Sequence, residues 1–130
     1  MSWPAALLAL LVSHLAGDVL FQTEPQALEK IGGLGDPLGR RALASHITYY
    51  TAAFVPALVW IGTQTTPARA VVVAIAVAVP HLLIDDGRFV AMWMREVKRA
   101  PNAEIGLRIA VDQSFHVICL FGAALIAAAG

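Results

Sequence analysis

The pentapeptide His14-Leu15-Ala16-Gly17-Asp18 lies in the second half of an apolar run that extends from Trp3 to Gln22. On an α-helix, a histidine and an aspartate four residues apart occupy the same face, one turn from each other. Two other apolar segments carry the same residue types at the same spacing, as His81 with Asp85 and as Asp112 with His116. A carboxylate in an apolar, membrane-like environment is costly, so each of these aspartates needs a compensating partner.

Length and composition favour a small membrane protein. The chain has 130 residues, of which 58% are hydrophobic and 14% are charged, against about 45–50% and about 25% in soluble domains. A chain of this size forms one domain, so we expect a single membrane domain over residues 1–130. The formal net charge of zero gives no reason to expect a nucleic-acid partner. The single cysteine, Cys119, excludes an internal disulfide.

Four apolar segments are each about 20 residues long, the length at which a helix crosses roughly 30 Å of hydrocarbon. They cover residues 3–22, 42–62, 67–86 and 107–129. The very short link between the second and third segments forces an antiparallel hairpin. We therefore predict an all-α fold, a polytopic membrane protein built as an antiparallel bundle of four transmembrane helices. The N-terminus lacks the basic region and cleavage site of a signal peptide, so the first segment is expected to remain as a span.

The segment from Gly87 to Gly106 carries basic and apolar residues at helical spacing. This pattern is typical of a short interfacial helix on an anionic membrane surface, which makes membrane lipids expected partners. All the basic residues except Arg69 lie in or beside the first and third connections. The positive-inside rule therefore places these connections in the cytoplasm and both termini on the outer, periplasmic side. Small residues such as Gly122, Ala123 and Ala124 in the fourth segment would allow a homo-oligomer.

In this topology the ionisable residues of the four segments fall at one depth near the cytoplasmic side, within a turn or two. All four histidines belong to this layer. We expect no lysine or arginine beside these acids within the hydrocarbon. Lys30 in the first connection could reach a substrate phosphate, but a lone lysine in a loop is usually solvated. Ionised aspartates without a basic neighbour need a cation, and carboxylates with neutral imidazoles are ligands of zinc, manganese or iron. The predicted metal ligands are His14, Asp18, His46, His81, Asp85, Asp112 and His116.

Seven ligands exceed the needs of one tetrahedral zinc ion, so they suit one or two divalent ions, with zinc preferred and manganese or iron as alternatives. An aspartate that is not fully used as a ligand, Asp85 or Asp112, would act as the catalytic general base. We expect Gln22, Gln113 and Tyr49 to contact the cofactor or the substrate. In the simpler interpretation each His–Asp pair only hydrogen-bonds between helices. Three such pairs at one depth favour a functional site.

The polar positions form the motifs His14-x-x-Gly17-Asp18-x-x-x-Gln22-Thr23, Lys30, His46, His81-x-x-Ile84-Asp85 and Asp112-Gln113-x-x-His116. In these residues, over nearly its whole length, the chain resembles a family of small bacterial inner-membrane proteins known only as a domain of unknown function. That resemblance implies the bacterial inner membrane as location and carries no established activity. More distantly, the chain is similar to membrane-associated metal-dependent hydrolases with histidine–aspartate pairs in transmembrane helices, which implies metal-dependent hydrolysis by analogy.

Three functions agree with these features. The preferred hypothesis is a metal-dependent hydrolase that acts on a lipid-like, lipid-linked or phosphorylated substrate at the cytoplasmic membrane face, where a metal ion activates water. One alternative is a carrier or channel for divalent metal ions or protons, although the outer halves of the spans are almost entirely apolar. The other is a structural or regulatory membrane subunit in which the metal only fixes the bundle.

Overall fold

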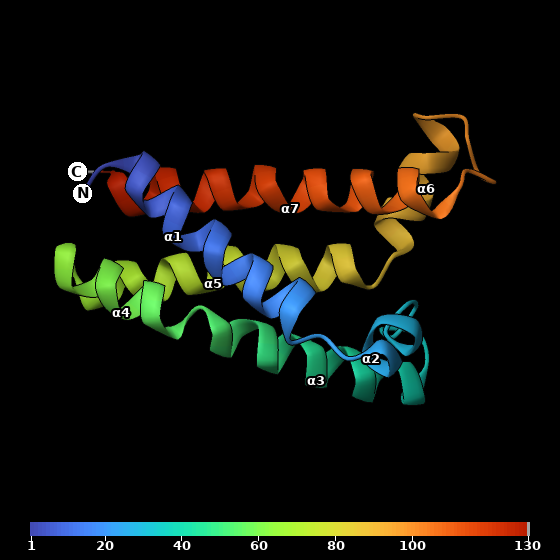
Figure 1. The fold of residues 1–130 in the computed structure, drawn as a ribbon, viewed down its shortest axis with the longest axis horizontal. Coiled ribbons are helices and arrows are strands. Elements are labelled where there is room, and N and C mark those ends of the chain that lie inside the picture. The colour runs from blue at the N-terminus through green and yellow to red at the C-terminus, as the bar shows by residue number, and fades with distance from the viewer. Residues whose placement is uncertain (130) are drawn as a thin grey trace.

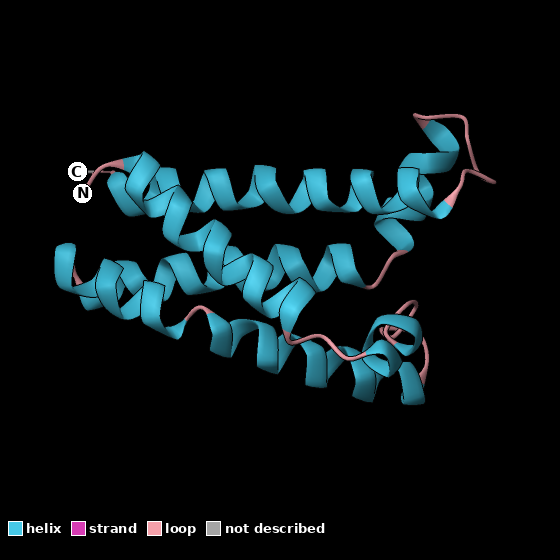
Figure 2. Ribbon diagram, viewed as in Figure 1, coloured by secondary structure: helices cyan, strands magenta, loops and turns pink. Residues whose placement is uncertain are grey.

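The computed structural model describes residues 1–129, which form helices joined by short turns and loops (Figures 1 and 2). No strand occurs among these residues, so the predicted all-α class is confirmed. The elements in chain order are α1 (Trp3–Leu15), the π-helical segment η1 (Ala16–Leu20), α2 (Glu24–Glu29), α3 (Pro37–Ala53), α4 (Val55–Gln64), α5 (Pro67–Asp85), α6 (Arg88–Glu96) and α7 (Ile105–Ala128).

Three helical stretches are long and apolar enough to cross a membrane, namely Trp3–Leu20, Pro67–Asp85 and Ile105–Ala128. A fourth candidate span consists of α3 and α4 together, which are bent by 44° relative to each other. These stretches coincide with the four apolar segments of the sequence. Large apolar side chains cover much of their outer faces, and such a surface is of the kind that lipid solvates.

The second candidate span is broken where the sequence predicts one segment over residues 42–62. Helix α3 already begins at Pro37, and the break falls at Phe54, between α3 and α4. Pro56 explains the break, because a proline has no N–H to donate and its ring would collide with the carbonyl of residue 52 in a continuous helix. Phe54 itself is fully buried at the bend, which fixes α3 and α4 against the core.

The polar connection between the first two spans is folded. At the start of α2, the side-chain oxygen of Gln26 accepts a hydrogen bond from the Thr23 N–H at 3.0 Å, which completes a capping box. At the start of α3, the carboxylate of Asp36 accepts one from the Gly39 N–H at 2.8 Å. Because both helix starts are capped, the connection has a defined course next to the end of the bundle.

Both termini lie at one end of the bundle, and α2 and α6 lie at the other, which we call the α2–α6 end (Figure 1). Helix α5 is central and packs against α7, α3, α4 and α6. A short helix, α6, stands between the third and fourth candidate spans, where the sequence predicts an interfacial helix. It is anchored by edge-to-face contacts of Phe89 and Trp93 with Phe115 of α7.

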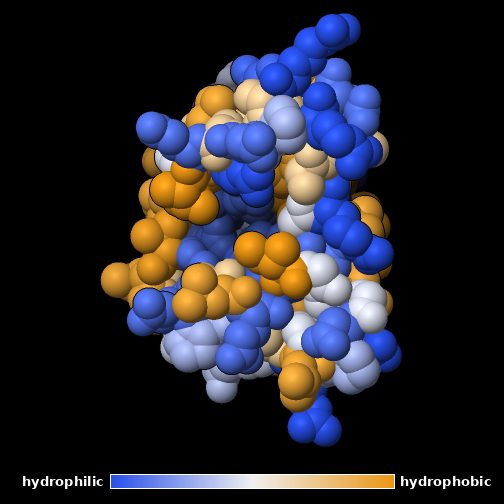
Figure 3. Space-filling model, turned by 90° about the vertical axis from the view of Figure 1, so that its right-hand side faces the viewer, coloured by the Kyte–Doolittle hydropathy of each residue, from blue (hydrophilic) through white to orange (hydrophobic). Residues whose placement is uncertain are grey.

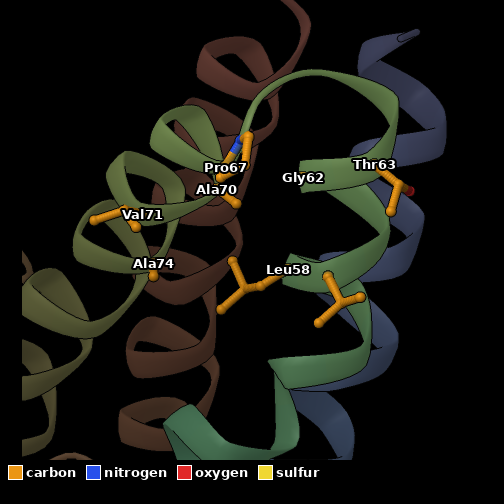
Figure 4. A pocket seen from close by; sticks show the side chains of 8 residues that line it. Leu58, Gly62, Thr63, Pro67, Ala70, Val71 and Ala74 are labelled. Carbon is orange, nitrogen blue, oxygen red and sulfur yellow. The ribbon is translucent and has the colours of Figure 1, made fainter.

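The half of the bundle nearest the termini is filled by apolar side chains. They form one buried cluster made up of Ala6, Leu10, Tyr50, Phe54, Ile61, Val73, Val77, Leu120, Ala123, Ala124 and Ala127. A groove at this end lies between α4 and α5 and is lined by eight residues, from Leu58 to Ala74, none of them ionisable (Figure 4). Apart from Arg69 at the start of α5, the charged and histidine side chains of the candidate spans lie in the opposite half.

Candidate metal centre

The predicted ligands converge in one layer toward the α2–α6 end. Helix α1 supplies His14, η1 supplies Asp18, α3 supplies His46, α5 supplies His81 and Asp85, and α7 supplies Asp112 and His116. Each of the four histidines is at most 2% exposed. Asp18 and Asp85 are also buried, whereas Asp112 is half-buried. Burial of this many polar side chains is tolerated only where they compensate one another or bind an ion.

The π-helical turn η1 and a close helix contact together place Asp18. A π-turn inserts an extra residue into a helix and is frequent at functional sites. Gly17 in this turn lies against Tyr50 of α3, so that an added Cβ would be between 3.0 and 3.2 Å from three atoms of Tyr50. Only a residue without a side chain allows this approach, which brings Asp18 within reach of His46.

The first ligand group consists of Asp18, His46, His81 and Asp85. His46 Nε2 lies 2.7 Å from Asp85 Oδ2, 3.0 Å from His81 Nε2 and 3.2 Å from Asp18 Oδ1. His81 Nε2 lies 3.3 Å from Asp85 Oδ2 and 4.0 Å from Asp18 Oδ1. Ligand atoms about 2.0–2.1 Å from a tetrahedral zinc ion lie about 3.3 Å from one another. The spacing of this group therefore suits a metal ion at its centre.

The second ligand group consists of Asp85, Asp112 and His116. Asp85 Oδ1 lies 3.4 Å from His116 Nε2, whereas Asp112 lies beside the other ring nitrogen, with Oδ2 3.4 Å from Nδ1. The two oxygens of Asp85 thus point into different groups, Oδ2 into the first and Oδ1 into the second. This is the arrangement of a carboxylate that can bridge two ions.

Three buried atoms lack a hydrogen-bond partner within the described part of the chain, namely Asp18 Oδ1, His81 Nδ1 and His116 Nε2. Leaving a buried polar atom unpaired costs about 1–3 kcal/mol, so such atoms need an explanation. Asp18 Oδ1 and His116 Nε2 are directed at the other ligand atoms, where a cation would satisfy both. His81 Nδ1 lies on the other side of its ring, which stacks on Tyr50 with the ring centroids 3.4 Å apart.

Hydrogen bonds behind two of the imidazoles direct their Nε2 atoms toward the ligand groups. His116 Nδ1 lies 3.0 Å from the carbonyl oxygen of Asp112, to which it can donate. In the amide orientation that satisfies its neighbours, the oxygen of Gln22 accepts from His46 Nδ1 at 3.2 Å. Outer hydrogen bonds of this kind fix the tautomer and the ring orientation of metal-binding histidines. The structure thus brings Gln22 to the cluster, as expected.

His14 differs from the other histidines because both of its ring nitrogens have partners. Nδ1 lies 3.1 Å from the hydroxyl of Tyr50, and Nε2 lies 3.0 Å from the amide oxygen of Gln113. The amide nitrogen of Gln113 in turn donates to Asp18 Oδ2 at 2.8 Å. His14 also belongs to a third group of converging atoms with Asp18 and His116. Its hydrogen bonds favour a role in holding Asp18 through Gln113.

Of the two adjacent tyrosines on α3, the structure brings Tyr50 to the cluster and leaves Tyr49 outside it. Tyr50 is 1% exposed, whereas Tyr49 is 60% exposed. Consecutive residues project about 100° apart around a helix, and the contact of Gly17 with Tyr50 decides which of the two faces inward. Tyr49, which the sequence predicts to contact the cofactor or substrate, therefore lies outside the cluster, and Tyr50 lies within it.

We expect Tyr50→Phe to weaken binding of Zn²⁺ by about tenfold. This is the lower end of the effect of removing a group that hydrogen-bonds to a metal-binding residue. The substitution removes the hydroxyl that meets His14 Nδ1 but keeps the ring that stacks on His81. Tyr49→Phe is the matched control and should leave the affinity unchanged. Competition with a chromophoric chelator in detergent measures both, and equal affinities would contradict a positioning role for the Tyr50 hydroxyl.

Lys30 contradicts the expectation that no basic residue accompanies the acids. Its side chain is 12% exposed, with Nζ 2.6 Å from Asp85 Oδ2 and 3.8 Å from Asp18 Oδ1. A lone lysine in a loop is usually solvated, so the sequence alone predicts no contact between Lys30 and the acids. Its presence among the motifs of the family resemblance was the one signal that could have indicated a role in the site.

The α2–α6 end gives access to this cluster. Figure 3 views the molecule from this end and shows a hydrophilic hollow in the end face. Lys30, Asp112 and Gln113, at the outer side of the cluster, are all partly exposed. The site therefore combines a buried ligand set with partly exposed polar side chains on one side, which we call the polar opening.

Comparison with known proteins assigns the chain to a family without a known function. Residues 6–129 match the family described as "Protein of unknown function (DUF3307)", so the chain belongs to this family. The resemblance to an uncharacterised family is thereby confirmed. No curated protein and no solved structure matches the chain, and the more distant similarity to metal-dependent hydrolases stays a prediction.

Proposed function

We propose that the chain is an integral membrane enzyme that uses one or two divalent ions to hydrolyse a lipid-like or phosphorylated substrate at the cytoplasmic membrane face. The observation that carries this proposal is the carboxylate of Asp85, whose two oxygens belong to two different ligand groups. A site with ligands for two ions exceeds what a structural ion needs, because a structural zinc site is closed by four ligands.

The positions of the two candidate general bases favour different roles for them. Asp85 has a side chain that is 2% exposed and faces both ligand groups, which suits a bridging ligand. Asp112 has a side chain that is 27% exposed and lies beside the polar opening, which suits a general base. When bound, the ions would lower the pKa of water and polarise the scissile group. Asp112 would take the proton as the water oxygen bonds to the phosphorus or acyl carbon and the leaving oxygen departs.

The apolar half of the bundle favours an enzyme over a carrier or channel. A continuous ion pathway would need polar groups along the full crossing. Between the ligand layer and the termini, the buried cluster around Leu10, Val77 and Leu120 contains only apolar residues and Tyr50. The polar site therefore opens at one end, as expected for chemistry at one membrane face.

To test this proposal, the protein is purified in detergent, loaded with Zn²⁺ or Mn²⁺ and assayed against lipid phosphates and carboxylic esters. We expect turnover that a chelator abolishes and that Asp112→Asn lowers by about 10²–10⁴-fold, the usual contribution of a general base. Glu96→Gln, which changes an exposed acid of α6, is the control and should keep full activity. Metal-independent turnover, or Asp112→Asn with full activity, would contradict the proposal.

A further inference from the structure

Lys30 places its ammonium group on the carboxylate that both ligand groups share. Its Nζ lies 2.6 Å from Asp85 Oδ2, and the same oxygen lies 2.7 Å from His46 Nε2. A divalent ion bound to this oxygen at about 2.0–2.2 Å would lie close to the ammonium group. Two cations at such a separation repel each other strongly in a partly buried site. Lys30 and the ion are therefore competitors for the same carboxylate.

The backbone around Lys30 is fixed on two sides. An added Cβ at Gly33 would lie 2.7 Å from the carbonyl oxygen of Gly39, so the connection touches the start of α3 directly. The Gly32 N–H donates to the carbonyl oxygen of Asp86 at 2.7 Å, and the Leu34 N–H donates to the carboxylate of Asp86 at 2.8 Å. These contacts with α3 and α5 hold the lysine backbone over the cluster.

The side chain itself can move while its backbone stays in place. Lysine carries its charge on a flexible stem of four methylenes, and the side chain of Lys30 is 12% exposed. When the side-chain amide of Gln22 is oriented to satisfy its neighbours, its oxygen lies 2.6 Å from Lys30 Nζ. Lys30 thus has an acceptor besides the two aspartates.

We propose that the ammonium group of Lys30 leaves Asp85 when the divalent ion binds there, and that it then binds the phosphate group of the substrate at the polar opening. This inference rests on the proposed function and makes Lys30 the residue that selects an anionic substrate. An ammonium ion is a point-charge ligand for phosphate, and here it would stand next to ions that attract the same anion. The phosphate could belong to a lipid headgroup or to a water-soluble molecule.

The test compares the Zn²⁺ affinity of the wild type, Lys30→Met and Lys98→Met in detergent. Lys98 is the other lysine of the chain and is exposed beyond the end of α6. Because the competing charge is gone, Lys30→Met should bind Zn²⁺ about tenfold more tightly or better, and Lys98→Met should match the wild type. Inorganic phosphate or dihexanoyl phosphatidic acid should tighten Zn²⁺ binding in the wild type and in Lys98→Met but not in Lys30→Met. An effect of the lipid alone would identify a headgroup as the source of the phosphate.

Zn²⁺ binding by Lys30→Met that is equal to or weaker than that of the wild type overturns the inference, while the metal site and the proposed function stand. A phosphate effect that persists in Lys30→Met overturns it as well. If none of the three proteins binds Zn²⁺, the proposed function fails together with the inference. Lys30→Gln, which keeps a polar side chain, repeats the comparison if circular dichroism shows that Lys30→Met does not fold.

Discussion

Asp85→Asn is expected to abolish stoichiometric binding of divalent ions. The substitution replaces a carboxylate that contributes one oxygen to each ligand group by a neutral amide with a single acceptor. Removing a residue that only hydrogen-bonds to a metal ligand already lowers the affinity for the metal ion by about 10–100-fold. Removing Asp85, a ligand common to both groups, should therefore lower it by more than about 100-fold. The amide would also stand next to Lys30, whose ammonium group would lose the negative charge that lies 2.6 Å from it.

Asp86→Asn is the matched control, because the next residue along the chain is an equally buried aspartate outside the ligand groups. Asp86 accepts a hydrogen bond from the Leu34 N–H and pairs with Arg88, and an asparagine oxygen can still accept from that N–H. Elemental analysis of both proteins after gel filtration in detergent measures bound metal per chain. Equal metal contents would show that Asp85 is not a ligand.

Gly17→Ala is expected to lower both the stability of the bundle and its affinity for Zn²⁺. The new methyl group would lie 3.0–3.2 Å from side-chain and backbone atoms of Tyr50, so Tyr50 and η1 must move apart by a few tenths of an ångström. Overpacking of this kind costs about 1–3 kcal/mol. Since Asp18 follows Gly17 directly, the separation would also move Asp18 away from His46, which lies 3.2 Å from it.

Gly122→Ala serves as the control for Gly17→Ala. Gly122 lies within α7, and an added Cβ there would meet nothing within 4 Å. We expect it to leave Zn²⁺ binding unchanged and to raise stability by about 0.4–1 kcal/mol, because alanine restricts the unfolded chain more than glycine does. Thermal unfolding in detergent, with and without Zn²⁺, separates the two variants. The same unfolding temperature for both would contradict the role of the Gly17 contact.

The sequence predicts much of the fold because local spacing determines it. Four apolar segments of helical length lead to four candidate spans, and residues four apart, such as His81 and Asp85, must share a helix face. The break at Phe54 follows from Pro56, two residues on, by the same kind of local rule, although the apolar pattern alone predicts one span over residues 42–62. These features need no knowledge of how the helices pack.

Features that depend on packing between distant segments could not be predicted from the sequence. The choice of Tyr50 over Tyr49 depends on the rotation of α3, which the contact with Gly17 fixes. The approach of Lys30 to Asp85 depends on a connection that folds back onto the end of α5 through Asp86. Residues 30 and 85 are far apart in the chain, and no periodicity relates them. Because of this ion pair, the aspartates are not without a basic neighbour, and a metal ion that binds them must displace Lys30.

Anomalous diffraction from crystals of the zinc-loaded protein, recorded on both sides of the zinc absorption edge, would show directly whether the buried His–Asp cluster binds metal. We expect an anomalous peak among Asp18, His46, His81 and Asp85, with Lys30 Nζ turned away from Asp85. A second peak between Asp85 and His116 would indicate two ions. Anomalous density only at surface residues, with Lys30 still paired to Asp85, would show that the cluster is not a metal site.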